Sequence, residues 1–139
     1  MARTTFSGPV LSQNGFIEGH QPTAFNAINA TATASAAQVA DGYITSTSAA
    51  ATTITMPTGT ALGAAVGASR GTVFDLFIDN TAGANTVTIA VNTNAILSTA
   101  AADTAGSFGD LTVAAGATGL ARYTIMFSSP TAYVFTRTA

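Results

Sequence analysis

Charge is the scarcest property of this 139-residue chain. Charged residues make up 7% of it, with four arginines, no lysine and six carboxylates, for a formal net charge of -2. About a quarter of the residues of an ordinary globular protein are charged. Nucleic-acid binding depends on clustered Lys and Arg, because neutralised phosphates release their counterions. The four arginines are scattered along the chain, so we expect no nucleic-acid partner.

Cysteine and tryptophan are absent, and there is one histidine. The missing thiols exclude disulfides, zinc ribbons and thiolate chemistry. No run of about 18 apolar residues is present, so no segment is predicted to span a bilayer and no membrane partner is expected. The first sixteen residues, MARTTFSGPVLSQNGF, lack the continuous apolar core of a secretory signal peptide.

Alanine and threonine are what the chain has in excess, with 30 and 25 copies respectively. Threonine is β-branched and packs well on a pleated surface. Small and β-branched side chains together favour flat sheets that pack closely, often against other copies. The composition is more typical of a virion, fibre or surface-layer subunit than of a free enzyme.

Residues 1–38 differ from the rest of the chain. Gly and Pro interrupt this stretch every few residues, which excludes a long helix. Residues 30–37 are a run of Ala, Thr and Ser that predicts a linker or a short helix ending near Gly42. Large apolar side chains lie along the stretch, although no private core is apparent for them: Phe6, Val10, Leu11, Phe16, Ile17, Phe25 and Ile28.

These anchors predict an arm that docks rather than a disordered tail, because disordered segments contain few aromatic residues. Burying three Phe side chains contributes roughly 5–9 kcal/mol. Ordering about 30 residues of backbone costs on the order of 30 kcal/mol or more. The arm must therefore also gain backbone hydrogen bonds, for example by adding a strand to a neighbouring subunit. The alternative is that residues 1–38 fold back on their own domain.

Residues 39–139 are predicted to form one β domain. Short alternating runs predict strands at 43–47, 52–56, 73–79, 87–91, 111–113, 120–127 and 132–137. The turn at 80–85 predicts a hairpin between the runs 73–79 and 87–91, and the turn at 128–131 predicts a second hairpin. The Ala- and Gly-rich stretch 58–69 predicts a short helical connector. The expected fold is all-β: an antiparallel β-sandwich or jelly-roll-like domain with a short helical connector and an extended N-terminal arm.

No motif predicts a catalytic or metal site. Residues 67–71 match G-x-S-x-G, but a helix-like stretch precedes Ser69 and a strand follows it, the reverse of a nucleophile elbow. Asp75 and Asp79 lie about 13 Å apart along a strand, too far to share a metal. A structural Ca²⁺ between Asp103 and Asp110 is a minor alternative. We therefore expect no enzyme activity, no catalytic residue, no metal and no cofactor.

Four other side chains have open alternatives. His20 follows two residues after Glu18 and is expected to be a solvated or interface residue. The chain's tyrosines, Tyr43, Tyr123 and Tyr133, could line a sugar platform. Tyr123 and Tyr133 are expected on the two strands of the last hairpin, where they could be cross-strand neighbours. Such tyrosines are more often core residues with a hydrogen-bonded hydroxyl.

Two stretches carry a resemblance to a known family. The sequences FSGPV at 6–10 and SQNGF at 12–16 resemble the opening of small head-decoration (cement) proteins of tailed bacteriophages. The sequences ITMPT at 54–58 and VFDLFIDNT at 73–81 resemble a β module that recurs in phage decoration and fibre proteins.

The resemblance implies a virion protein on the outer capsid surface, made in the cytoplasm of the host bacterium. It implies a homotrimer that sits where capsid subunits meet, with the major capsid protein as its partner and an N-terminal arm on the shell. The family pattern does not fix the contact residues, so the apolar anchors of the arm are our own prediction: Phe6, Val10, Leu11, Phe16, Ile17 and Phe25. The alternative is a head-fibre or tail-fibre receptor-binding protein that grips host glycans.

Overall fold

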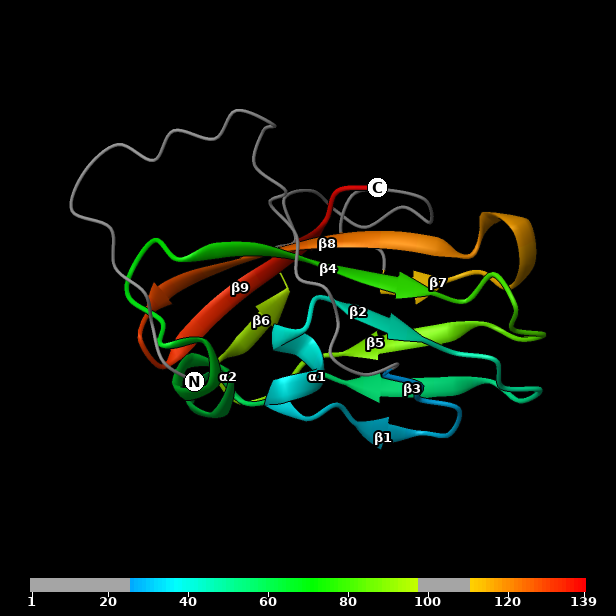
Figure 1. Ribbon diagram of the computed structural model, residues 1–139, viewed down its shortest axis with the longest axis horizontal. Helices are drawn as coiled ribbons and strands as arrows, with labels where there is room; N and C mark the ends of the chain where they lie inside the picture. The colour runs from blue at the N-terminus through cyan, green and yellow to red at the C-terminus, as the bar shows by residue number, and fades with distance from the viewer. Residues whose placement is uncertain (1–25, 98–110) are drawn as a thin grey trace, which may run out of the picture.

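The computed structural model describes residues 26–97 and 111–139, and in these residues the chain forms two β-sheets with two short α-helices at one end (Figure 1). The four-stranded sheet has the order β1 (Ala32–Thr33), β3 (Thr52–Thr55), β5 (Val87–Ala90), β7 (Thr112–Val113). The five-stranded sheet has the order β2 (Tyr43–Thr45), β4 (Val73–Asp79), β8 (Leu120–Ser129), β9 (Ala132–Arg137), β6 (Ala95–Leu97). The helices are α1 (Ala36–Ala40), α2 (Gly59–Val66) and the 3-10 turn Gly116–Thr118.

The predicted positions of the strands are confirmed. Each alternating run contains a strand, and the short strands β1 and β6 are additions that the pattern did not predict. The connector at 58–69 contains α2, and the short helix expected before Gly42 is α1, which ends at Ala40. Gly42 has φ +75°, a left-handed conformation that glycine adopts without strain.

The prediction that the sheets are antiparallel is wrong, and a jelly roll is not confirmed. The pairs β1–β3, β3–β5, β2–β4 and β6–β9 are parallel, whereas β4–β8, β8–β9 and β5–β7 are antiparallel. From β1 to β5 the chain alternates between the two sheets. Each sheet therefore receives its successive strands in the same direction, which makes them parallel neighbours.

The predicted hairpin between residues 73–79 and 87–91 is also wrong, because β4 and β5 belong to different sheets. Asn80, at the start of this loop, is fully buried and connects the loop to the opposite sheet. Its side-chain amide donates to the carbonyl oxygens of Asn85 at 2.9 Å, Val113 at 3.2 Å and Ala114 at 2.9 Å. The loop is thereby tied to the end of β7, in the opposite sheet. The second hairpin, β8–β9, is confirmed.

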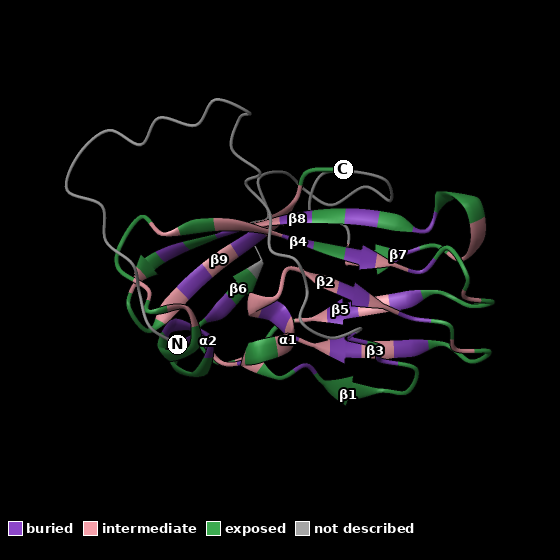
Figure 2. Cartoon of the chain, in the orientation of Figure 1, coloured by how far each residue is buried: buried purple, intermediate pink, exposed green. Residues whose placement is uncertain are grey.

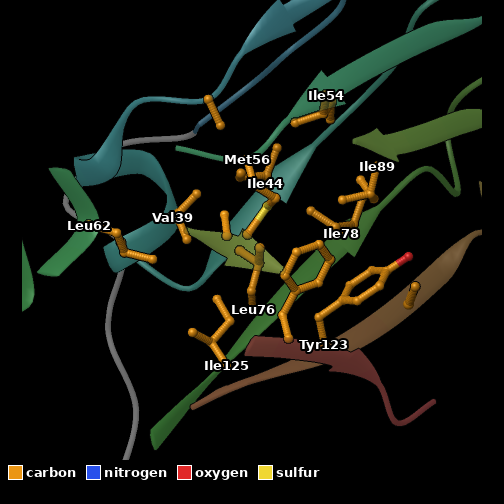
Figure 3. Close-up of a cluster of buried hydrophobic side chains, with 14 of the residues drawn as sticks. Val39, Ile44, Ile54, Met56, Leu62, Leu76, Ile78, Ile89, Tyr123 and Ile125 are labelled. Carbon is orange, nitrogen blue, oxygen red and sulfur yellow. The ribbon is translucent and has the colours of Figure 1, made fainter. Parts of the chain in front are cut away.

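The core lies between the two sheets, where inward side chains of both form one cluster. Ile54 and Ile89 from the four-stranded sheet approach Ile78 and Tyr123 from the five-stranded sheet (Figure 3). Tyr123 and Tyr133 are not cross-strand partners, because Tyr123 pairs with Arg137 and Tyr133 with Phe127. Neither ring is exposed, so these two tyrosines belong to the core and form no sugar platform.

The hydroxyl of Tyr133 has a specific buried partner. It donates to the carbonyl oxygen of Pro57 at 2.7 Å. Burial raises the pKa of Tyr133 well above its usual value, because the phenolate would lose its hydration. This hydrogen bond connects β9 to the residue that precedes the N-cap of α2.

Helix α2 packs directly on the turn between β8 and β9. Thr58 caps its first turn, since its hydroxyl accepts from the backbone N–H of Ala61. A Cβ on Gly63 would lie 1.9 Å from the carbonyl oxygen of Pro130. A Cβ on Gly59 would lie 2.2 Å from that of Thr131. These glycines lie close to backbone, and they let the helix approach the turn.

Residues 26–38, which the sequence prediction assigned to the arm, lie within the sandwich. Ile28 and Ala34 are buried in the core, and β1 pairs with β3. Ala27 also bridges Thr45, at the edge of the five-stranded sheet beyond β2. The part of the predicted arm that remains is residues 1–25, which lie outside the described residues.

Candidate interaction surface

A row of apolar side chains crosses the outer face of the five-stranded sheet. Val73 of β4 is paired with Met126 of β8, Met126 with Val134 of β9, and Val134 with Ile96 of β6. Directly opposed residues project from the same face of a sheet. Their sequence neighbours, such as Ile125, Phe127 and Phe135, point inward and are buried. The four side chains Val73, Met126, Val134 and Ile96 are called the apolar row below.

The apolar row is open to solvent. Val73 is 54% exposed, Met126 49% and Ile96 57%, while Val134 is half-buried. Buried and exposed residues alternate along β8, as expected for a strand with one covered face (Figure 2). Leu120 and Phe77 are also exposed on this face, nearer its opposite end. Single exposed apolar residues are ordinary, but several on one face make that face a candidate interaction surface.

The polar groups next to the apolar row are already paired with one another. The guanidinium of Arg122 lies 2.7 Å from Asp75 Oδ2, and the hydroxyl of Thr124 donates to Asp75 Oδ1 at 2.7 Å. These residues come from β4 and β8, in the rows between Val73 and Leu120. The central charges of the face are therefore neutralised within the protein.

A second polar cluster lies where β2 meets β4. The hydroxyl of Tyr43 donates to Asp79 Oδ2 at 2.5 Å, and the backbone N–H and hydroxyl of Thr81 donate to Asp79 Oδ1 at 2.9 and 2.6 Å. The Thr81 hydroxyl, followed by Tyr43 and the Thr81 N–H, lowers the pKa of the Asp79 carboxyl. The same bond to Asp79 raises the pKa of Tyr43. The cluster closes the β2 side of the face with polar groups.

The outer face of the four-stranded sheet has a different chemistry. Thr53, Thr88 and Thr112 form one cross-strand row, and Thr33, Thr55 and Ala90 form the next. All six are exposed or half-buried. This face therefore presents hydroxyls and methyls of short side chains, and the two outer faces of the protein are chemically unlike.

The predicted contact residues of the arm lie outside the described residues: Phe6, Val10, Leu11, Phe16, Ile17 and Phe25. The same holds for Glu18, His20, Asp103 and Asp110. The predictions made for these residues therefore remain predictions.

The G-x-S-x-G match at 67–71 lies between α2 and β4, in the order that the sequence predicted. Gly67 caps the helix with φ +60°, and the Ser69 hydroxyl lies 3.5 Å from that of Thr72. Within residues 26–97 and 111–139, no three His, Cys, Asp or Glu side chains gather as metal ligands would. In the same residues no helix has the length and apolar character needed to cross a membrane.

Sequence reasoning did not identify the apolar row. The individual signals are present: Val73, Ile96 and Met126 occupy positions where an outward-facing strand residue is usually polar. They are far apart in the sequence, and only the register between four strands brings them into line. The threonine face has a stronger signal, the alternation of Thr with buried Ile in residues 52–55.

Comparison with known proteins adds no relative: no protein-family model matches the chain, and no curated protein or solved structure is detectably similar to it.

Proposed function

We propose that this chain is a structural protein of a bacteriophage virion, a decoration protein that binds the outer surface of the head as a homotrimer and strengthens contacts between capsomers. The observation that supports this most directly is the difference between the two outer faces. One face carries the apolar row, and the other carries threonines. A decoration protein needs one adhesive surface, for the shell or for its own subunits, and one surface that does not bind neighbouring particles.

The N-terminal arm is proposed to make contacts both to the shell and to neighbouring subunits of the trimer. Phe6, Val10, Leu11, Phe16, Ile17 and Phe25 are its large apolar side chains. In a trimer three such arms act together, because once one has docked the others bind at high effective concentration. The partner is the major capsid protein. The function is mechanical, since added contacts between capsomers resist the pressure of packaged DNA.

The resemblance of residues 6–16, 54–58 and 73–81 to decoration proteins supports the same proposal. The receptor-binding alternative needs a surface that grips host glycans. Tyr123 and Tyr133 are fully buried, so neither can offer its ring to a sugar. We therefore favour the decoration function.

The first test is the copy number of the chain in purified virions of the phage that encodes it, measured by mass spectrometry against the major capsid protein. A ratio near one is the expected result for a protein that covers the shell. A few copies per virion would contradict decoration and support a fibre, and absence from the virion would refute both.

A binding assay then tests the arm. The truncation that removes residues 2–25 ends before Asn26, so it keeps the pairing of residues 26–28 with β2 and the buried side chain of Ile28. We expect the truncated protein to fold and to lose binding to undecorated heads. Full occupancy of heads by the folded truncated protein would contradict the proposed role of the arm.

A further inference from the structure

We infer that the apolar row is the docking site for the N-terminal segment, residues 1–25, of a second copy of this chain. The inference deepens the proposed function, because it rests on a homotrimer whose arms reach neighbouring subunits. It assigns the receiving surface: the outer side of β4, β8, β9 and β6, centred on Met126 and Val134.

The segment and the row match in chemistry. Residues 1–25 contain six of the large apolar side chains named above and only two charged residues, Arg3 and Glu18. The receiving face offers exposed apolar groups beside charges that are already paired within the sheet. The stretch 6–17 contains no charged residue, so it can cover the apolar row without burying a charge of its own.

The dimensions also match. Four adjacent strands place the ends of the row three inter-strand spacings apart, about 14 Å at about 4.8 Å each. An extended segment of 25 residues reaches up to about 80 Å at about 3.3 Å per residue. The stretch from Phe6 to Ile17 alone, at about 40 Å, is long enough to cross the row. The segment can therefore leave its own subunit and still cover the row of a neighbour.

The point at which the described chain begins favours a neighbour over the same subunit. The N–H of Ile28 donates to the Thr45 carbonyl, and the N–H of Thr45 donates to the Asn26 carbonyl, both at 2.9 Å. Asn26, where the described chain begins, thus lies at the edge beyond β2. That edge lies across the sheet from β6, which carries Ile96.

Polar groups lie between that edge and the apolar row. A segment crossing its own sheet would first cover the Tyr43–Asp79 hydrogen bond and then the Asp75–Arg122 ion pair. Removing these groups from water costs free energy that apolar contacts do not return. A segment arriving from the β6 edge meets Ile96 and Val134 first. A donor edge and a receiving edge on opposite sides also suit head-to-tail contacts, which close into a ring.

Disulfide trapping tests the inference cleanly, because the natural chain has no cysteine. Two full-length variants, Phe16→Cys and Met126→Cys, carry tags of different mass and are co-expressed so that mixed assemblies form. After mild oxidation, non-reducing electrophoresis separates mixed dimers from either homodimer. The matched control replaces Met126→Cys with Thr88→Cys, which places the thiol on the threonine face of the other sheet.

The expected result is a mixed dimer of Phe16→Cys with Met126→Cys that predominates over the product with Thr88→Cys. Equal products with both partners, or homodimers of Met126→Cys in place of the mixed dimer, would overturn the inference. The double variant Phe16→Cys/Met126→Cys completes the test, since a purely intramolecular disulfide in it would assign the row to the chain's own arm and refute exchange.

The experiment needs no capsids, so its outcome is separate from that of the proposed function. Mixed dimers in a protein that is absent from virions would support arm exchange and reject decoration. Full copy number in virions without mixed dimers would support decoration and reject arm exchange.

Discussion

Asn80 is the residue whose loss we expect to be most costly among the buried polar groups described. The variant Asn80→Ala removes the donor shared by the carbonyls of Asn85, Val113 and Ala114. A side-chain amide has two N–H groups, so it makes two hydrogen bonds at any moment to these three acceptors, and the variant loses two. Each buried acceptor left unsatisfied costs about 1–3 kcal/mol. Asn80 Oδ1 is itself buried without a partner, so its removal returns part of that cost.

The expected loss in the free energy of unfolding is therefore about 2–4 kcal/mol, a large part of the about 5–15 kcal/mol of a typical domain. Urea denaturation followed by circular dichroism measures it. The matched control is Asn85→Ala, whose amide donates to the Ala49 carbonyl at an exposed position, and we expect it to cost less than about 1 kcal/mol. Equal losses in the two variants would refute the role of Asn80 as the tie between the sheets.

Three further predictions follow from single contacts. Gly63→Ala should lower the melting temperature, because the new Cβ would collide with the Pro130 carbonyl, whereas helix propensity alone predicts a gain of about 1 kcal/mol; a higher melting temperature would contradict the close approach of α2. Asp79→Asn should destabilise the protein at neutral pH. Because the folded-state pKa of Asp79 is lowered, its contribution is present above about pH 4 and disappears as the pH falls through the folded-state value, so a stability difference that persists unchanged in acid would reject this explanation. Tyr133→Phe should cost about 1–2 kcal/mol in chemical denaturation, since it leaves the buried carbonyl of Pro57 without its donor, and a neutral effect would show that this hydrogen bond adds no stability.

The positions of the strands could be predicted from the sequence because alternation is a local property. Thr53 and Thr55 alternate with the buried Ile54, and the pattern marks a strand with one covered face wherever that strand is placed. The capping threonine and the small residues of α2 are equally local signals. For the same reason the apolar character of residues 1–25 is readable from the sequence.

The direction of the strands and their division between two sheets could not be predicted in this way. The turn at 80–85 has the composition of a hairpin, yet Asn80 finds its hydrogen-bond acceptors at Val113 and Ala114, more than thirty positions away. Local turn chemistry favoured one pairing, and a buried side chain with distant partners imposed another.

The sequence by itself determined the chemistry available to this protein: few charges, no thiols, many threonines, strands at readable positions and an apolar N-terminal segment. Only the tertiary structure decided which of those side chains meet. Val73, Ile96, Met126 and Val134 become one surface because strand register places them in line across four strands. Alternation specifies which face of its own strand a residue occupies. Its neighbours across the sheet depend on the pairing of strands that are far apart in the sequence.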